Sequence, residues 1–154
     1  MWVCRVGKKD EYLRIVKDKG YLYLPWEHYN GDLTGMDMNA IKNLVKKEKK
    51  TDNPTSISNW AGQLDAFVNK LLDDDYVIIP LKASSEFLLV KIVSGYEYDA
   101  TGIDGLHHRH KIRIVQCGIR KEVFSMNTWY SLRAYRTIFQ VRNENEVLCA
   151  IETA

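Results

Sequence analysis

The fold is decided by residues 56–99, a stretch that opens with Ser-Ile-Ser-Asn-Trp-Ala-Gly-Gln-Leu at 56–64, continues to Val-Ile-Ile-Pro-Leu-Lys at 77–82 and ends with Gly-Tyr-Glu-Tyr-Asp at 95–99. From Ile57 to Leu71 the apolar residues recur every three or four positions, which predicts an amphipathic helix capped near Thr55 or Ser56. Apolar segments follow at 76–81, 86–93 and 111–117, separated by turn-rich connections. This order predicts a helix followed by an antiparallel β-meander.

Shorter elements flank this stretch on both sides. We expect strands at 2–6, 21–24 and 137–141, and helices at 10–16, 39–47, 127–136 and 143–152. Short strands mixed with helices, without βαβ alternation, predict an α+β fold with a small, curved, mostly antiparallel sheet or open barrel flanked by helices. A chain of 154 residues is the size of one core, so we expect a single domain over residues 1–154.

Cysteine use and hydropathy indicate a soluble protein of the reducing cytoplasm. Cys4, Cys117 and Cys149 are far apart and lack Cys-x-x-Cys spacing, so neither a disulfide framework nor a thiolate metal site is indicated. No apolar run approaches the roughly 18 residues that a membrane span needs, and the N-terminus has no signal-peptide pattern. We therefore expect no membrane contact.

Motifs of known catalytic sites are not found in the sequence. There is no Ser-His-Asp or Cys-His arrangement, no phosphate-cradling glycine loop and no Glu-x-Lys on a predicted strand. The histidine-rich segment 107–111 has cations on both sides and no paired cysteine or carboxylate at ligand spacing. We therefore expect no enzyme activity, no metal and no cofactor.

Charge and aromatic residues suggest contact with nucleic acid. The net charge is only +2, so a basic binding face must come from uneven distribution, and basic runs do occur at 42–50 and 107–113. Aromatic residues lie near predicted element ends at Trp26, Trp60, Tyr96, Tyr98, Trp129 and Tyr130. Aromatic faces grip an extruded base because every base has a π-face. Trp60 also falls on the apolar stripe of its helix, so a core role for it is equally compatible with the pattern.

Several segments resemble, in order and spacing, the EVE-like module of the PUA superfamily, which is related to YTH domains and occurs at the N-terminus of Mrr-type and other modification-dependent restriction proteins. The matching segments are Trp-Val-Cys-Arg-Val-Gly at 2–7, Leu-Pro-Trp at 24–26, Gly-Asp-Leu at 31–33, Asn-Trp-Ala-Gly-Gln-Leu at 59–64, Pro-Leu-Lys at 80–82, Gly-Tyr-Glu-Tyr at 95–98, Arg-Ile-Val at 113–115 and Tyr-Ser-Leu at 130–132. The resemblance covers nearly the whole chain. It implies a PUA-like fold and a module that reads nucleic acid, of a kind that also occurs within longer defence proteins.

The resemblance also implies where a base would bind. In related domains one cage aromatic comes from the start of the central helix, which corresponds to Trp60 here, and a second from the strand at 113–117, where this chain has Cys117 in place of tryptophan. The expected base-binding pocket consists of Trp26, Ser58, Asn59, Trp60, Tyr96, Tyr98 and Cys117. The expected phosphate contacts are Arg5, His108, Arg109, Lys111 and Arg113.

The resulting hypothesis is a non-catalytic reader that flips a modified base of double-stranded DNA into an aromatic pocket and directs a linked or partner nuclease in prokaryotic defence. Two alternatives stay open. One is a sensor of a small ligand such as a nucleotide, or a protein-interaction module, on the same fold; Cys117 and the nearly neutral net charge favour it. The other is an RNA-binding module.

Overall fold

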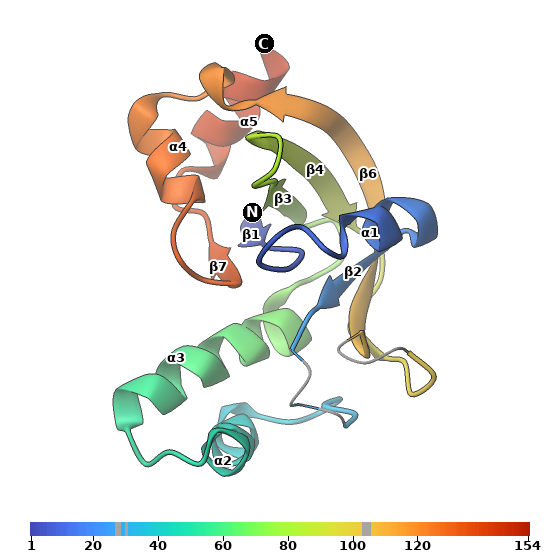
Figure 1. Cartoon of the computed structure of the whole chain (residues 1–154), viewed down its shortest axis with the longest axis vertical. Helices are drawn as coiled ribbons and strands as arrows, with labels where there is room; N and C mark the ends of the chain where they lie inside the picture. The colour runs from blue at the N-terminus through green and yellow to red at the C-terminus, as the bar shows by residue number, and fades with distance from the viewer. Residues whose placement is uncertain (27–28, 30, 103–105) are drawn as a thin grey trace.

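A strongly curved sheet forms the centre of the protein (Figure 1). The computed structural model describes residues 1–26, 29, 31–102 and 106–154. The strands are β1 (Trp2–Cys4), β2 (Tyr21–Leu24), β3 (Tyr76–Pro80), β4 (Glu86–Ile92), β5 (Glu97–Tyr98), β6 (His108–Arg120) and β7 (Ile138–Gln140). They are ordered β2-β6-β4-β3-β1-β7, and β5 pairs with β6 outside this path. The pairing of β1 with β3 is parallel, whereas the other pairs among the described residues are antiparallel.

Helices cover the sheet at three places. They are α1 (Leu13–Lys19), α2 (Met38–Lys49), α3 (Pro54–Asp65), α4 (Met126–Leu132) and α5 (Glu144–Glu152), with a π-helical turn (Ala66–Lys70) after α3 and a short 3-10 turn (Lys121–Val123) before α4. In Figure 1, α2 and α3 lie together below the sheet, whereas α4 and α5 lie beside its upper part. Within the described residues, no helix has the length and apolar character needed to cross a membrane.

The sheet is buried on both faces, which explains the nearly continuous apolar runs in β3 and β4. Alternate residues of each strand enter different cores, because side chains point to opposite faces with a period of two. Leu88 and Val90 of β4 face an inner core formed with β2, α2, α3 and the π-helical turn. Phe87 and Leu89 face an outer core covered by α4 and α5. The two cores therefore hold α3 and α4 on opposite sides of the same strands.

The α+β class and the curved sheet flanked by helices are confirmed, and the arrangement is compatible with the open barrel of PUA-like domains. The predicted meander is also confirmed, since β3, β4 and β6 are antiparallel neighbours. The first helix begins at Leu13, three residues later than predicted. The reason is that Asp10 has a positive φ of 58° and its carboxylate accepts hydrogen bonds from the backbone N–H groups of Lys82 (2.7 Å) and Ala83 (3.0 Å).

β6 begins at His108 rather than at Lys111 because two histidines of the predicted loop are core residues. His108 and His110 are 1% and 0% exposed. The two ring nitrogens of His110 lie 3.0 Å from the Ser94 carbonyl oxygen and 2.6 Å from the Phe67 carbonyl oxygen, so this ring connects β6 to the π-helical turn. Buried polar side chains need such partners. With them, β6 extends over thirteen residues, from His108 to Arg120.

The His108 ring is held in one tautomer. Its Nε2 donates to the Tyr29 carbonyl oxygen, which can only accept, so Nδ1 of the neutral ring accepts from the Tyr96 hydroxyl at 2.6 Å. Burial lowers the pKa of His108 from its ordinary value of 6.5, against the opposing effects of the Tyr29 hydrogen bond and of Asp32, while His107 adds to the lowering. Burial also raises the pKa of Tyr96 to about 12, so its hydroxyl stays protonated.

Burial favours the neutral form of His108 in the folded state, so this ring binds a proton more tightly in the unfolded chain than in the folded protein. The difference becomes important below the ordinary pKa of 6.5. We expect the free energy of unfolding to fall as the pH is lowered from 7.5 to 5.5, by at most about 1.4 kcal/mol per pH unit from this group. Urea unfolding of the wild type and of His108→Gln at several pH values measures this effect. A variant with the wild-type pH slope would contradict the prediction.

Candidate functional site

A cleft of about 740 Å³ opens between α3 and α4. Its walls come from segments that are distant in the sequence, namely the connection after β1, the middle of α3, the β3–β4 hairpin, the 3-10 turn, α4 and the segment 133–137. Figure 1 shows α3 and α4 on opposite sides of β7 and of the chain that leaves β1. The cleft therefore exists because the inner and outer cores hold these helices apart.

The charged side chains of the cleft are mainly cationic. The cations are Arg5, Lys8, Lys82, Lys121, Arg133 and Arg136, and they face one carboxylate, that of Glu86. Among the described residues none of these six forms an ion pair. Partial burial and the neighbouring Arg133 lower the pKa of the Arg5 guanidinium below its ordinary value, although an arginine remains charged at neutral pH. Such uncompensated positive charge favours an anionic ligand.

Two indoles line the cleft from opposite helices. Trp60 is half-buried on α3, and Trp129 is half-buried on α4. Arg133 and Lys121 lie over the Trp129 ring, with Cζ 4.6 Å and Nζ 5.3 Å from its centroid. Lys49 lies over Trp60, with Nζ 3.9 Å from the ring centroid. The cleft thus combines planar aromatic surfaces with cations, which suits a ligand that has both an aromatic ring and a phosphate.

Trp26 and Trp60 form one continuous wall. Their ring centroids are 5.1 Å apart with an interplanar angle of 70°, so the two indoles touch edge to face. A planar base cannot enter between rings that are already in contact, so these two tryptophans do not lie on opposite sides of one base. A base can instead stack on this wall from the cleft.

A smaller groove of about 350 Å³ adjoins the cleft on the far side of this wall. It shares Arg5 and Trp60 with the cleft and is also lined by Trp26, Tyr29 and Lys49. The Tyr29 hydroxyl is buried and has no hydrogen-bond partner among the described residues. Burial, together with the charge of Glu48, raises the pKa of Tyr29 to about 12, so the group remains a potential donor.

Hydrogen bonds attach the segment 133–137 to the rest of the cleft. The Arg5 guanidinium donates to the carbonyl oxygens of Arg133 (3.1 Å) and Ala134 (3.2 Å), and the Arg5 backbone N–H donates to that of Thr137 (2.8 Å). The side-chain oxygen of Gln63, a buried residue of α3, accepts from the N–H groups of Thr137 (2.9 Å) and Ile138 (3.3 Å). These contacts fix the segment against both β1 and α3.

The structure gathers only part of the expected base-binding pocket. Trp26, Asn59 and Trp60 line the cleft or the groove, whereas Ser58 is exposed on α3 and lines neither. Tyr96 and Tyr98 lie at the other end of β6, against the rings of His107 and His108. Residues 115–118, which include Cys117, are all exposed. They lie where two irregularities interrupt the register of β6 with β4 and Gly118 has a φ of 65°, and none of them lines the cleft or the groove.

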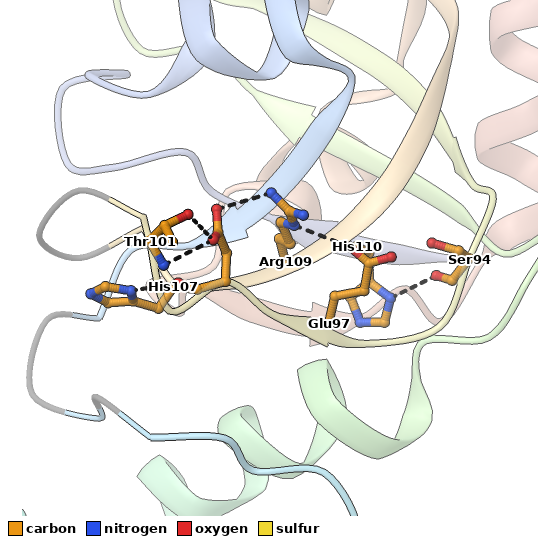
Figure 2. A network of polar contacts seen from close by, with 7 residues as sticks. Ser94, Glu97, Thr101, His107, Arg109 and His110 are labelled. Carbon is orange, nitrogen blue, oxygen red and sulfur yellow. Dashed lines mark hydrogen bonds and ion pairs between the residues drawn. The ribbon is translucent and has the colours of Figure 1, made fainter.

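The expected phosphate contacts need a similar correction. Arg5 lines the cleft, but His108 is buried and cannot reach a phosphate. Arg109 donates to Glu97 and Asp99, each at 3.1 Å (Figure 2). Its guanidinium also lies 4.1 Å from the Tyr21 ring centroid. Two carboxylates already neutralise this cation. Lys111 and Arg113 are exposed on β6 and do not line the cleft.

Sequence reasoning missed most of the cleft cations because each is isolated in the sequence or lies in a short connection. Lys82 has no basic neighbour, Lys8 and Lys121 belong only to the pairs Lys8-Lys9 and Arg120-Lys121, and only the fold brings them together. One local signal was available, the Arg-Ala-Tyr-Arg segment at 133–136, in which cations and an aromatic alternate. Such interleaving is typical of surfaces that contact nucleic acid.

The anchoring role of Gln63 predicts a loss of stability in Gln63→Leu, which keeps the size of the side chain but removes the acceptor for two backbone N–H groups. An unsatisfied buried donor costs about 1–3 kcal/mol, and we expect a loss of this size in the free energy of unfolding. Urea denaturation measures it, with Gln116→Leu at an exposed position of β6 as the matched control. Equal stability of the two variants would contradict the assignment.

The side chains that line the cleft offer stacking and anion contacts. No histidine or cysteine lines the cleft among the described residues. Nowhere among the residues that the structure describes do three or more His, Cys, Asp or Glu side chains form a group that could hold a metal ion. Comparison with curated proteins and with solved structures found no match. Residues 2–142 match a protein family, and the chain belongs to that family, which is described as a domain of unknown function (DUF8426).

Proposed function

We propose that this protein is a non-catalytic reader of nucleic acid that holds one unstacked base in the cleft between α3 and α4. The observation that carries the proposal is that six cations and two indoles line one cleft of about 740 Å³. Among the described residues these cations form no ion pair. Ligand sites typically have volumes of about 300–1,000 Å³, so the cleft can take a nucleotide. In this proposal Trp60 and Trp129 contact the base, and the cations contact the phosphates on either side.

The free energies involved are compatible with base extrusion. Unstacking and flipping a base costs a few kcal/mol, and stacking on an aromatic side chain returns about 1–3 kcal/mol per base. Phosphate contacts add a favourable term that weakens with salt, because neutralising phosphates releases counterions. A base that already pairs weakly, such as a mismatched or damaged base, is flipped at lower cost.

The preferred target in this proposal is double-stranded DNA that carries a modified base. The resemblance of the chain to EVE-like modules supports this choice, as does the compatibility of the curved sheet with a PUA-like open barrel. Reading of this kind would direct a nuclease, linked to the protein or acting as its partner, to modified DNA. The small net charge that favours a small-ligand sensor carries less weight here, because the positive charge is concentrated in the cleft.

Arg136→Ala is expected to weaken duplex binding and to reduce the slope of log K against log salt by about 1, because one phosphate contact is lost. Arg113→Ala is the matched control, since Arg113 is an exposed arginine outside the cleft, and we expect wild-type binding. Fluorescence polarisation with unmodified, N6-methyladenine, 5-methylcytosine and 5-hydroxymethylcytosine duplexes at two salt concentrations measures both. Equal effects of the two substitutions would contradict the assignment of the cleft.

Trp129→Ala is expected to lower affinity about 5- to 150-fold, the range that corresponds to one stacked base. Trp60→Ala is the companion variant, and its folding is checked by thermal unfolding because Trp60 also packs on the inner core. The same polarisation assay gives the affinities. Binding that is insensitive to salt and to both substitutions would indicate a small-ligand or protein-interaction module instead, and preference for RNA of the same sequence would indicate an RNA-binding module.

A further inference from the structure

Tyr135 is exposed to an unusual degree for a large aromatic side chain. It is 98% exposed, compared with 40–68% for the other exposed large hydrophobic residues of the described chain. It lies at the rim of the cleft, in the segment between Arg133 and Arg136, and both of these arginines are themselves exposed. An aromatic ring in this position contributes nothing to either core. The ring is therefore free to contact a molecule outside the folded chain.

The backbone beneath Tyr135 is held in place. The Arg5 guanidinium donates to the carbonyl oxygens of Arg133 and Ala134, and the Arg136 N–H donates to the Ala134 carbonyl oxygen at 2.9 Å. One residue further on, Thr137 is bonded to Gln63 and to the backbone of Arg5. The Tyr135 side chain is thus exposed while the backbone around it is fixed by hydrogen bonds. Little backbone entropy would therefore be lost when Tyr135 contacts a ligand.

A duplex from which a base has been flipped has a gap in its stack. Proteins that deform duplex DNA commonly insert an apolar side chain between base pairs, and this insertion offsets part of the cost of unstacking. The side chain that fills the gap must lie beside the pocket that takes the base and must project from the protein. Tyr135 meets both conditions, since it lines the same cleft as Trp60 and Trp129.

We propose that Tyr135 is a wedge that enters duplex DNA at the position vacated by the flipped base, while Arg133 and Arg136 contact the phosphates on either side of it. This inference rests on the proposed function and adds to it the form of the ligand, because only a double-stranded target has a stack for the wedge to fill. It also assigns different roles to aromatic residues of one cleft. Trp60 and Trp129 hold the base, and Tyr135 holds the duplex open.

The test compares Tyr135→Ala, Tyr135→Phe and Met126→Ala on a modified duplex and on the single strand that carries the same base. Met126 is the control because it is an exposed apolar residue of α4 that does not line the cleft. We expect Tyr135→Ala to weaken duplex binding by about tenfold, the effect of one aromatic stack, and to leave single-strand binding within about twofold of the wild type. Tyr135→Phe retains the ring and should bind both forms like the wild type.

A second readout follows base flipping through the base next to the modified one. 2-Aminopurine placed next to the modified base should gain fluorescence when the wild type binds, and should gain less with saturating Tyr135→Ala. Unchanged duplex affinity in Tyr135→Ala, or an equal loss on single and double strands, would overturn the wedge while leaving the reader intact. Absence of nucleic-acid binding by the wild type, or binding that survives Trp60→Ala, Trp129→Ala and Arg136→Ala, would overturn the proposed function and the wedge with it.

Discussion

The hydrogen bonds of Arg5 and Gln63 to the segment 133–137 are the contacts on which the cleft depends. Arg5 follows β1, Gln63 lies on α3, and the segment links α4 to β7. These hydrogen bonds join three parts of the chain that are more than fifty residues apart in sequence. Without these contacts the loop that carries Arg133, Tyr135 and Arg136 would have no fixed position relative to Trp60.

Distribution of charge, rather than its total, distinguishes this protein's surface. The net charge is +2, yet six cations and one carboxylate line the cleft. At the other end of β6 the opposite arrangement holds, because Arg109 is paired with both Glu97 and Asp99 (Figure 2). The charge of Arg109 is neutralised within the fold, whereas the six cleft cations form no ion pair among the described residues, so their positive charge is available to a ligand. This difference locates the candidate interface at the cleft and not along the histidine-rich segment.

Much of the fold could be predicted from local patterns. Period-three and period-four spacing of apolar residues identified α3. The parallel pairing of β1 with β3 could not be predicted, since it joins strands about seventy residues apart. The length of β6 was missed because His108 and His110 have polar side chains, and their burial depends on carbonyl partners that only the folded chain supplies.

The candidate site could be predicted only in part. Trp26, Asn59, Trp60 and Arg5 were identified and do lie at the cleft or the adjoining groove, whereas Tyr96, Tyr98 and Cys117 were also expected there and lie elsewhere. The missing cations come from short connections, whose positions are set by the two cores and not by local sequence. A hydrophobic pattern in the sequence can identify a helix or strand and its buried face. Which connections between elements lie next to one another is known only from the tertiary structure.

The measurement that tests the central claim most directly is a crystal structure of the protein bound to a duplex that carries a modified base. The account predicts one base outside the helix in the cleft, stacked on Trp60 or Trp129, with backbone phosphates at Arg133 and Arg136. A bound duplex with every base stacked, or one lying along β6 at Lys111 and Arg113, would contradict it.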